Sequence, residues 1–226
     1  MLSIDVFPGE DGHAQERSKL FQVLATVESD DVSIADRNFC TLNFLSGIVA
    51  RNSYFIIREH KCLPWHDASE FNPIGSVKGT KVLEQVVQVS DDEGYLSTIR
   101  RVQVILDKTT RDGDSQISIL TNLPSTVANA LVIAQIYRQR WTIETLFQIV
   151  SEEIFNCEIK ALGYPKAALL AFCVTLISYN ILSVVLAALR SVHGIEKIEQ
   201  EVSSYYLADE IRGTYRGMMI AIPPPE

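Results

Sequence analysis

Short apolar runs alternate with segments of helical periodicity along residues 3–58, and this order constrains the fold more than any other feature of the chain. The runs with strand character are residues 3–7, 32–35 and 54–58. Between them, apolar residues recur at helical spacing, and this pattern predicts helices around Leu20–Val27 and over residues 39–50. The order strand, helix, strand, helix, strand is typical of a parallel α/β arrangement. The sequence therefore predicts an α/β core in which Asp36 directly follows a strand.

A different pattern follows this core. Residues 59–81 contain prolines and glycines at several positions and are predicted to be irregular. The β-rich runs 81–90 and 96–107 are separated by an Asp-Asp-Glu-Gly turn and predict a hairpin. Residues 117–121 predict another strand, after which Ser125 or Thr126 is expected to cap a helix. The expected organisation is a partial α/β core (1–59), a β-rich insertion (60–124), core helices (125–190) and a polar helix with a tail (191–226).

Composition and cysteine spacing narrow the class of protein. A hydrophobic content of 47% indicates a globular chain rather than a disordered one. The four cysteines are widely spaced without a Cys-x-x-Cys pair, which favours reduced thiols in a cytosolic setting and disfavours a zinc site. The chain does not open on a secretory signal pattern.

The net charge of −8 is unfavourable for contact with nucleic acid. Any DNA contact is therefore expected to depend on local basic clusters rather than on a basic surface as a whole. The candidate clusters are Arg100–Arg101, Lys108–Arg111 and Arg138–Arg140.

Residues 167–189 carry no charged side chain, and this length alone is compatible with a membrane span. Several polar residues interrupt the segment, among them Thr175, Tyr179 and Asn180. Polar groups of this kind are costly in lipid unless they find partners. We expect a buried core helix here, with a single membrane span as the alternative.

Tyr137, Arg140 and Glu144 carry the chemistry of the predicted helix. Their spacing places the three side chains within roughly 60° of arc on one helix face. A carboxylate beside an arginine and a phenol suits a residue that holds a metal ion next to a bound phosphate. Taken alone, the same pattern is also typical of an exposed helix face.

Further motifs accompany this pattern in the same order along the chain: residues 35–39 (Ala-Asp-Arg-Asn-Phe), residues 121–124 (Thr-Asn-Leu-Pro) and the Arg-Trp-x-Ile-Glu-x-x-Phe run that begins at Arg140. Over roughly residues 1–190 the chain resembles the C-terminal part of the bacterial insertion-sequence transposases of family four. Their third catalytic carboxylate lies in a Tyr-x2-Arg-x3-Glu-x6-Lys signature. Ser151 stands at the lysine position, which implies the loss of one cationic phosphate contact.

The resemblance implies a ribonuclease-H-like catalytic core of the DDE type, interrupted by a β-rich insertion before the last catalytic helix. By resemblance, Asp36 is the second catalytic carboxylate and Glu144 the third, and both are metal ligands in a two-ion Mg²⁺ site. Tyr137 and Arg140 are implied to contact phosphates of the transposon-end DNA. For Asp36 the residues alone also allow a helix cap. Trp141 is expected to pack in the core.

The first aspartate of such a site has no candidate in the sequence. In the family it comes from the first strand, whereas residues 3–7 correspond to the third. The resemblance therefore implies a core that is incomplete at the N-terminus, with the strand that ends at Asp36 at an exposed edge. We expect a truncated or split transposase that is inactive by itself, so whether the chain is an enzyme stays open.

The expected partners are transposon-end DNA and a second chain, in a homodimer or in a heterodimer with full-length transposase. A small-molecule substrate is not expected, and the expected location is the bacterial cytoplasm, at the nucleoid. Two alternatives remain: a non-catalytic interaction or inhibitor protein derived from a transposase, and a single-span membrane protein.

Overall fold

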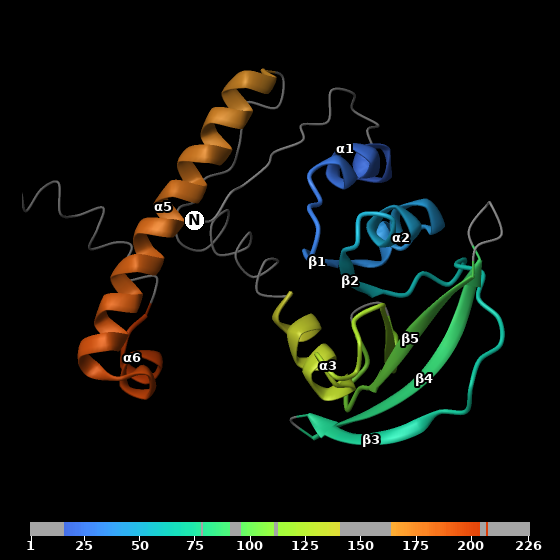
Figure 1. Ribbon diagram of the computed structural model, residues 1–226. Coiled ribbons are helices and arrows are strands. Elements are labelled where there is room, and N and C mark those ends of the chain that lie inside the picture. Colours follow the sequence, from blue (N-terminus) through green and yellow to red (C-terminus); the bar gives the residue numbers. More distant parts are fainter. Residues whose placement is uncertain are drawn as a thin grey trace, which may run out of the picture. The chain divides into compact units, whose positions relative to one another are not determined.

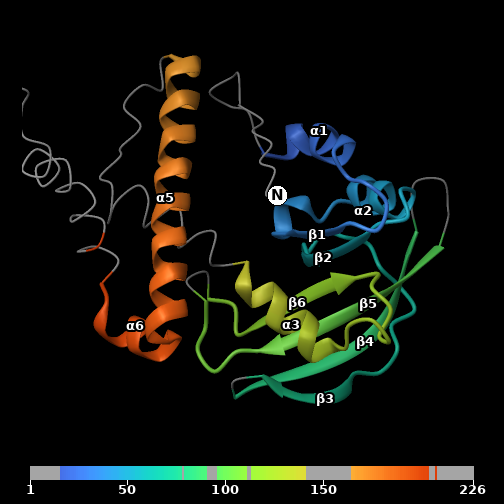
Figure 2. The same cartoon turned by 60° about the vertical axis from the view of Figure 1, so that its left-hand side comes forward.

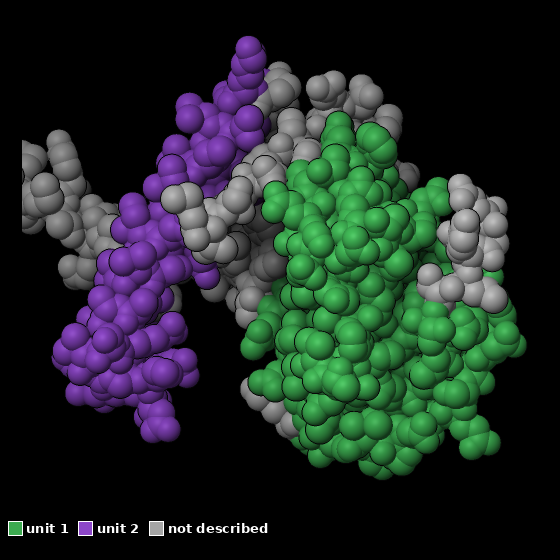
Figure 3. Space-filling view, viewed as in Figure 1, with its two compact units in different colours: residues 1–141 green, residues 142–226 purple. Residues whose placement is uncertain are grey.

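The computed structural model describes residues 16–77, 79–90, 96–110, 113–140, 164–203 and 207. The chain divides into two compact units, Met1–Trp141 and Thr142–Glu226 (Figure 3). The first unit contains a sheet with helices, and the described part of the second contains two helices. The strand predicted at residues 3–7 lies outside the described residues.

A six-stranded mixed sheet forms the centre of the first unit (Figure 1, Figure 2). Its strands are β1 (Val32–Ala35), β2 (Tyr54–Arg58), β3 (Asn72–Val77), β4 (Thr80–Ser90), β5 (Leu96–Ile105) and β6 (Gln116–Thr121). They lie in the order β1-β2-β6-β5-β4-β3. β1 and β2 are parallel, and all other neighbours are antiparallel. The fold is therefore mixed α/β, and among the described strands the predicted parallel pairing is found between β1 and β2.

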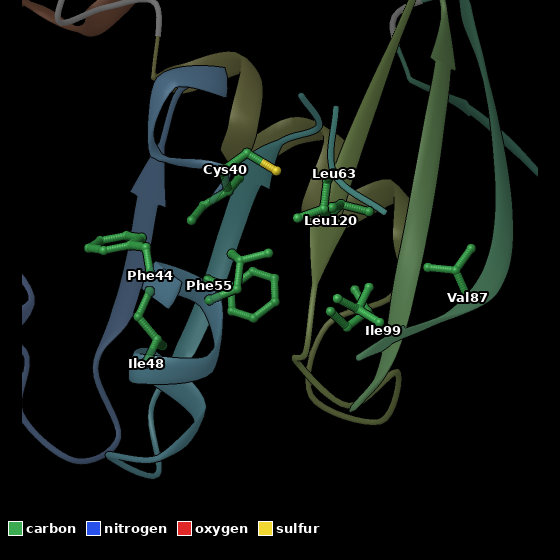
Figure 4. Close-up of a cluster of buried hydrophobic side chains, with 11 residues drawn as sticks. Cys40, Phe44, Ile48, Phe55, Leu63, Val87, Ile99 and Leu120 are labelled. Carbon is green, nitrogen blue, oxygen red and sulfur yellow. The ribbon is translucent and has the colours of Figure 1, made fainter. Parts of the chain in front are cut away.

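Helices cover both faces of this sheet. α1 (Leu20–Ala25) and α2 (Leu42–Val49) pack on one face, and α3 (Ala130–Gln139) packs on the other. The short 3-10 helices η1 (Glu16–Lys19) and η2 (Arg37–Phe39) precede α1 and α2. Successive side chains of β2 point to opposite faces of the sheet. Phe55 (Figure 4) and Ile57 pack in the hydrophobic core under α2, whereas Ile56 packs in the core under α3. α1 approaches α2 closely at Gly47, where an added Cβ would collide with Leu24.

β3 corrects the expectation that residues 59–81 are irregular. Pro73 and Gly75 lie within this strand, and the register with β4 shifts between them. β3 is an edge strand, where a proline without an N–H group is tolerated because no further strand needs that donor. A β-bulge at this point, with a positive φ at Gly75 (153°), accommodates the shift in register between β3 and β4.

The start of α3 corrects the expected cap. Residues after Pro124 form a turn, with the N–H groups of Val127 and Ala128 donating to the Pro124 carbonyl. The helix begins at Ala130, and the side chain of Asn129, not Ser125 or Thr126, accepts the N–H of Val132 at 3.0 Å. Sequence reasoning placed the cap too early because serine and threonine are also good caps.

Two polar side chains hold the connection from β6 to α3. Asn122 accepts the N–H of Phe55 at 2.8 Å and donates to the carbonyl of Ser53 at 2.9 Å, so it continues the pairing with β2 beyond the end of β6. Arg100 on β5 donates to the carbonyls of Leu123 at 2.7 Å and Ala128 at 2.8 Å. These contacts fix where α3 begins relative to the sheet.

β1 lies at one edge of the sheet, as expected for the strand that ends at Asp36. Its side chains Val32 and Ile34 are 44% and 42% exposed. Both lie on the face of the sheet that carries α3, because Ile34 is in register with Ile56. Among the described residues, no strand pairs with the outer edge of β1, and the two apolar side chains beside it are exposed.

The second unit contains α5 (Pro165–His193) and α6 (Ile195–Glu201), which pack together beyond Gly194. Leu182 and Ile198 are buried. Among the described residues, Lys166–His193 is long and apolar enough to cross a membrane, and an 18-residue window within it has a mean hydropathy of 2.3. A core helix and a membrane span share this length and composition, so the expected core helix stays a prediction.

Candidate functional site

Asp36 lies directly beyond the carboxyl end of β1, as predicted. It is half-buried, and its Oδ1 accepts the N–H of Asn38 at 2.7 Å, so it caps η2. Among the described residues, no hydrogen bond to Oδ2 is formed. The capping interpretation of Asp36 is thus correct, and it leaves the second carboxylate oxygen available to a ligand.

Arg58 joins Asp36 at this edge. β1 and β2 are parallel with Ala35 opposite Ile57, so one residue further along the same register Asp36 stands opposite Arg58. Both side chains leave the sheet on the α3 face, because Ile34 and Ile56 precede them by two residues. The carboxyl ends of two adjacent parallel strands therefore bring a carboxylate and a guanidinium together, at the position where α/β sheets usually bind ligands.

Tyr137 reaches the same place from the last turns of α3. Its side chain is only 3% exposed, and its hydroxyl forms no hydrogen bond of good geometry with a described residue. Burial raises the pKa of this hydroxyl above its ordinary value, and the nearby Arg140 guanidinium acts in the opposite direction. Arg58 lowers the pKa and Asp36 raises it by smaller amounts, so both charges lie within electrostatic reach of the phenol.

Arg140 follows α3 and lies against the phenol, with its guanidinium carbon 5.5 Å from the centre of the Tyr137 ring. This distance is within the range of a cation–π interaction. The structure thus brings Tyr137 and Arg140 together, whereas the predicted place of Glu144 on the same helix face stays a prediction. Together with Asp36 and Arg58 they form a site of one carboxylate, two guanidinium groups and one phenol.

Arg58 is the member of this site that sequence reasoning missed. Its Nη2 lies 2.5 Å from Oδ2 of Asp114, in the loop before β6. Its position in the sequence could have indicated this role, because Arg58 is the last residue of a buried strand and Asp36 comes directly after the neighbouring strand. A single cation after a strand is too common a pattern to be singled out by itself.

Glu144, Trp141 and Ser151 lie outside the described residues, so the predicted approach of Glu144 to Asp36 stays a prediction. In the part of the chain that the structure describes, no three His, Cys, Asp or Glu side chains are grouped as metal ligands would be. Of the two predicted carboxylate ligands, Asp36 is the one that lies among the described residues.

The basic clusters expected to contact DNA have varied roles. Arg100 and Arg101 point to opposite faces of β5 and are held inside the unit, the first by Glu84 at 2.6 Å and the second by Glu59 at 2.7 Å. They are structural rather than free to contact a phosphate, because each is less than one-sixth exposed. Lys108 is exposed, and Arg111 lies outside the described residues.

Comparisons with known proteins bear on this geometry. Residues 1–181 match the family model described as a transposase DDE domain. A segment of 124 residues is 26% identical to a protein described as the probable transposase for insertion sequence element IS5377 of Geobacillus stearothermophilus. The alignment covers 55% of this chain and 31% of the relative, so the chain spans about a third of the relative's length.

Proposed function

The chain belongs to the transposase DDE domain family, and from this premise we propose that it takes part in metal-dependent cleavage and transfer of DNA strands at the ends of an insertion sequence. Family membership gives a transposase function in general terms. The observation that carries the finer proposal is the convergence of Asp36, Arg58 and Tyr137 at the carboxyl edge of β1 and β2. A carboxylate next to cations and a buried phenol suits a metal ion beside a phosphate.

In this proposal Asp36 and Glu144 are two of the carboxylates that hold divalent ions, with Mg²⁺ as the natural choice. The donor set fits, because carboxylates are hard oxygen ligands and the second oxygen of Asp36 forms no hydrogen bond with a described residue. When bound, such ions polarise the attacking hydroxyl and neutralise charge on the leaving oxygen of a phosphodiester. We assign no residue to the remaining carboxylate of a DDE site.

The other side chains position the DNA strand. Arg140 binds a phosphate oxygen through charge-assisted hydrogen bonds, which a planar guanidinium forms in pairs. The Tyr137 hydroxyl donates to the same phosphate group. Its raised pKa keeps the phenol protonated, and therefore a donor, throughout the neutral range. Arg58, held by Asp114, adds positive charge at the same edge.

We interpret β1, α2 and β2 as part of a ribonuclease-H-like core, and the β-rich residues 60–124 as an insertion that extends its sheet. The parallel pairing of β1 with β2 and the antiparallel pairing of β6 with β2 support this interpretation. The partners proposed with it are transposon-end DNA and a second transposase chain. The proposed location is the bacterial nucleoid.

Metal affinity tests this proposal without requiring complete activity. Mn²⁺ binding is measured by electron paramagnetic resonance on the 226-residue protein and on the variants Asp36→Asn and Glu144→Gln. Asparagine caps a helix about as well as aspartate, so the first variant removes the charge and keeps the local fold. Loss of outer-sphere partners alone commonly costs 10–100-fold in metal affinity, so loss of a direct ligand should cost at least about tenfold.

Matched controls are Asp67→Asn and Glu70→Gln, which neutralise exposed acids elsewhere in the first unit. Both should bind Mn²⁺ as the unmodified protein does. Unchanged Mn²⁺ affinity in both site variants would remove these carboxylates from the mechanism.

A second candidate function rests on α5. Its length and its mean hydropathy of 2.3 are compatible with a membrane span. Extraction of cell membranes with high salt and then with alkaline carbonate separates the two candidates. Release into the supernatant supports the DNA-acting protein, and retention through both washes supports the membrane protein.

A further inference from the structure

Three segments of the first unit meet beyond the carboxyl ends of β1 and β2. Asp36 follows β1, Arg58 ends β2, and Asp114 comes two residues before the start of β6. β6 is antiparallel to β2 with Ile119 opposite Arg58, so the residues before β6 continue past the end of β2. Because β2 lies between β1 and β6, Arg58 has a carboxylate in the neighbouring segment on each side.

Of these two carboxylates, Arg58 forms an ion pair with that of Asp114. Its Nη2 donates to Oδ2 of Asp114 at 2.5 Å, and the two side chains are only 17% and 25% exposed. The Asp36 carboxylate takes no part in this pair. Its Oδ1 accepts the N–H of Asn38, and its Oδ2 forms no hydrogen bond with a described residue. Asp114 therefore decides where the Arg58 guanidinium lies.

Backbone hydrogen bonds hold the turn that carries Asp114. The N–H of Thr110 donates to the carbonyl of Asp114 at 2.9 Å, and the N–H of Asp114 donates to Oγ1 of Thr110 at 3.0 Å. The N–H of Leu106 donates to the carbonyl of Ser115 at 2.9 Å and closes the base of the same turn. The Asp114 carboxylate is thus presented from a backbone position that is fixed relative to β5 and β6.

Asp36 is the alternative partner of Arg58 in the register of the sheet. Ala35 pairs with Ile57, and neighbouring strands lie about 4.8 Å apart, which is within reach of an arginine side chain. A guanidinium paired with Asp36 would cover the oxygen that a divalent ion needs, and its charge would repel the ion at close range. Pairing with Asp114 leaves that oxygen uncovered.

We propose that Asp114 is a positioning residue of the metal site, which holds the Arg58 guanidinium so that Oδ2 of Asp36 stays open to a divalent ion. This inference rests on the proposed function, because it takes Asp36 as a metal ligand. Asp114 contacts neither the ion nor the DNA in this role. Outer-sphere residues of this kind commonly affect metal affinity strongly, because they orient the groups around the ion.

A double-mutant cycle on Mn²⁺ affinity tests this role. Mn²⁺ binding is measured by electron paramagnetic resonance on the 226-residue protein, Asp114→Asn, Arg58→Met and the double variant. Asp114→Asn should weaken binding about tenfold, the loss expected for an outer-sphere partner. In the Arg58→Met background the same change should cost at most about threefold, because no guanidinium remains to cover Asp36.

Asp107→Asn is the matched control, because Asp107 is an exposed aspartate in the same connection between β5 and β6. It should leave Mn²⁺ affinity within about twofold of the original. Asp114→Glu keeps the carboxylate and should bind Mn²⁺ more tightly than Asp114→Asn does. Equal losses from Asp114→Asn with and without Arg58 would overturn the positioning role in favour of a general charge effect. Circular dichroism melting confirms that each variant is folded.

A measurement without metal shows which partner Arg58 takes. Urea denaturation in EDTA gives the coupling between Arg58→Met and Asp36→Asn, as the departure of their midpoint shifts from additivity. The coupling should be larger in the Asp114→Asn background than in the unmodified one, because the freed guanidinium then pairs with Asp36. A coupling that is the same in the two backgrounds would also overturn the positioning role.

The two readouts keep the positioning role apart from the proposed function. If Asp36→Asn loses Mn²⁺ affinity while Asp114→Asn keeps it, the positioning role is wrong and the metal site stands. If Asp36→Asn and Glu144→Gln retain Mn²⁺ affinity while the coupling in EDTA rises without the Asp114 charge, Asp114 does control Arg58 and the catalytic assignment is wrong.

Discussion

Asp36 at the end of β1 lies close enough to Tyr137 near the end of α3 for its charge to act on a hydroxyl that burial already makes hard to ionise. The two residues belong to elements that are far apart in the sequence, and the sheet brings them together. Asn122 and Arg100 make this possible, because they fix the connection between β6 and α3. The geometry of the candidate site thus depends on the hydrogen bonds of Asn122 and Arg100 as well as on the residues of the site itself.

Tyr137→Phe separates a binding role from a structural one. The Tyr137 hydroxyl is buried without a well-formed hydrogen bond to a described residue. Its removal should therefore leave the free energy of unfolding within about 0.5 kcal/mol of the original or slightly raise it. DNA affinity should fall about five- to tenfold if the hydroxyl donates to a phosphate. Urea denaturation and DNA anisotropy measure the two effects on the same preparation.

Tyr54→Phe, at a half-buried tyrosine on β2, is the control for Tyr137→Phe and should change neither quantity appreciably. A Tyr137→Phe variant that loses stability but keeps its DNA affinity would make the phenol a packing residue.

Much of the first unit was predictable because its elements are short, apolar and regular. β1, β2 and the hairpin of β4 and β5 follow the strand patterns in the sequence closely. β3 was not predicted because Pro73 and Gly75 usually interrupt strands. Both are tolerated here because β3 lies at the edge of the sheet, and the sequence of a single strand does not show that position.

The candidate site was predictable to the extent that its residues form patterns along the chain. Tyr137 lies in α3 and Arg140 directly follows that helix, and Asp36 follows a recognisable strand. Arg58 was missed because its importance comes from register with Asp36 across the sheet. Arg100 was misassigned to DNA contact because its partners, Glu84 and the turn before α3, are distant in sequence. Tertiary pairing decides whether an arginine is buried or free.

Asn122→Ala should destabilise the first unit. The variant leaves the N–H of Phe55 and the carbonyl of Ser53 without their present partner, and each is at a buried position. An unsatisfied buried polar group costs about 1–3 kcal/mol, so a loss of roughly 2–4 kcal/mol is expected. Urea denaturation monitored by circular dichroism measures it. Asn43→Ala, at an exposed position in α2, should have little effect, and similar losses in the two variants would contradict the role assigned to Asn122.

Arg100→Met should also destabilise the fold, because it removes the partner of Glu84 and the donors to the turn before α3. Both side chains of the ion pair are less than one-fifth exposed. Breaking one partner of such a pair commonly costs about 3–5 kcal/mol, since the other charge stays behind.

A double-mutant cycle with Glu84→Gln tests this assignment of Arg100. Neutralising Glu84 in the Arg100→Met background should recover part of the loss. Arg138→Met, at an exposed arginine on α3, is the control and should cost little. Strict additivity of Arg100→Met and Glu84→Gln would contradict the ion pair as the source of the effect.

Cys40 gives a pH-dependent prediction. Burial raises the pKa of its thiol to about 11 from the ordinary 9.0, with a partly opposing contribution from the His60 backbone. The folded state thus holds the proton more tightly than the unfolded state. The resulting stabilisation is complete below pH 9, declines as the pH rises, and is lost above about pH 11. Between pH 8 and pH 10.5 the unmodified protein should lose about 2 kcal/mol more stability than Cys40→Ala does.

Urea denaturation at the two pH values measures this difference, and all other titrating groups are common to the two proteins. Cys62→Ala, at an exposed thiol, is the control and should follow the unmodified protein. Mass spectrometry after brief treatment with iodoacetamide at neutral pH should find Cys62 alkylated and Cys40 intact, because only the former is accessible. Rapid alkylation of Cys40, or a pH dependence unchanged by Cys40→Ala, would show that this thiol is not sealed between α2 and the sheet.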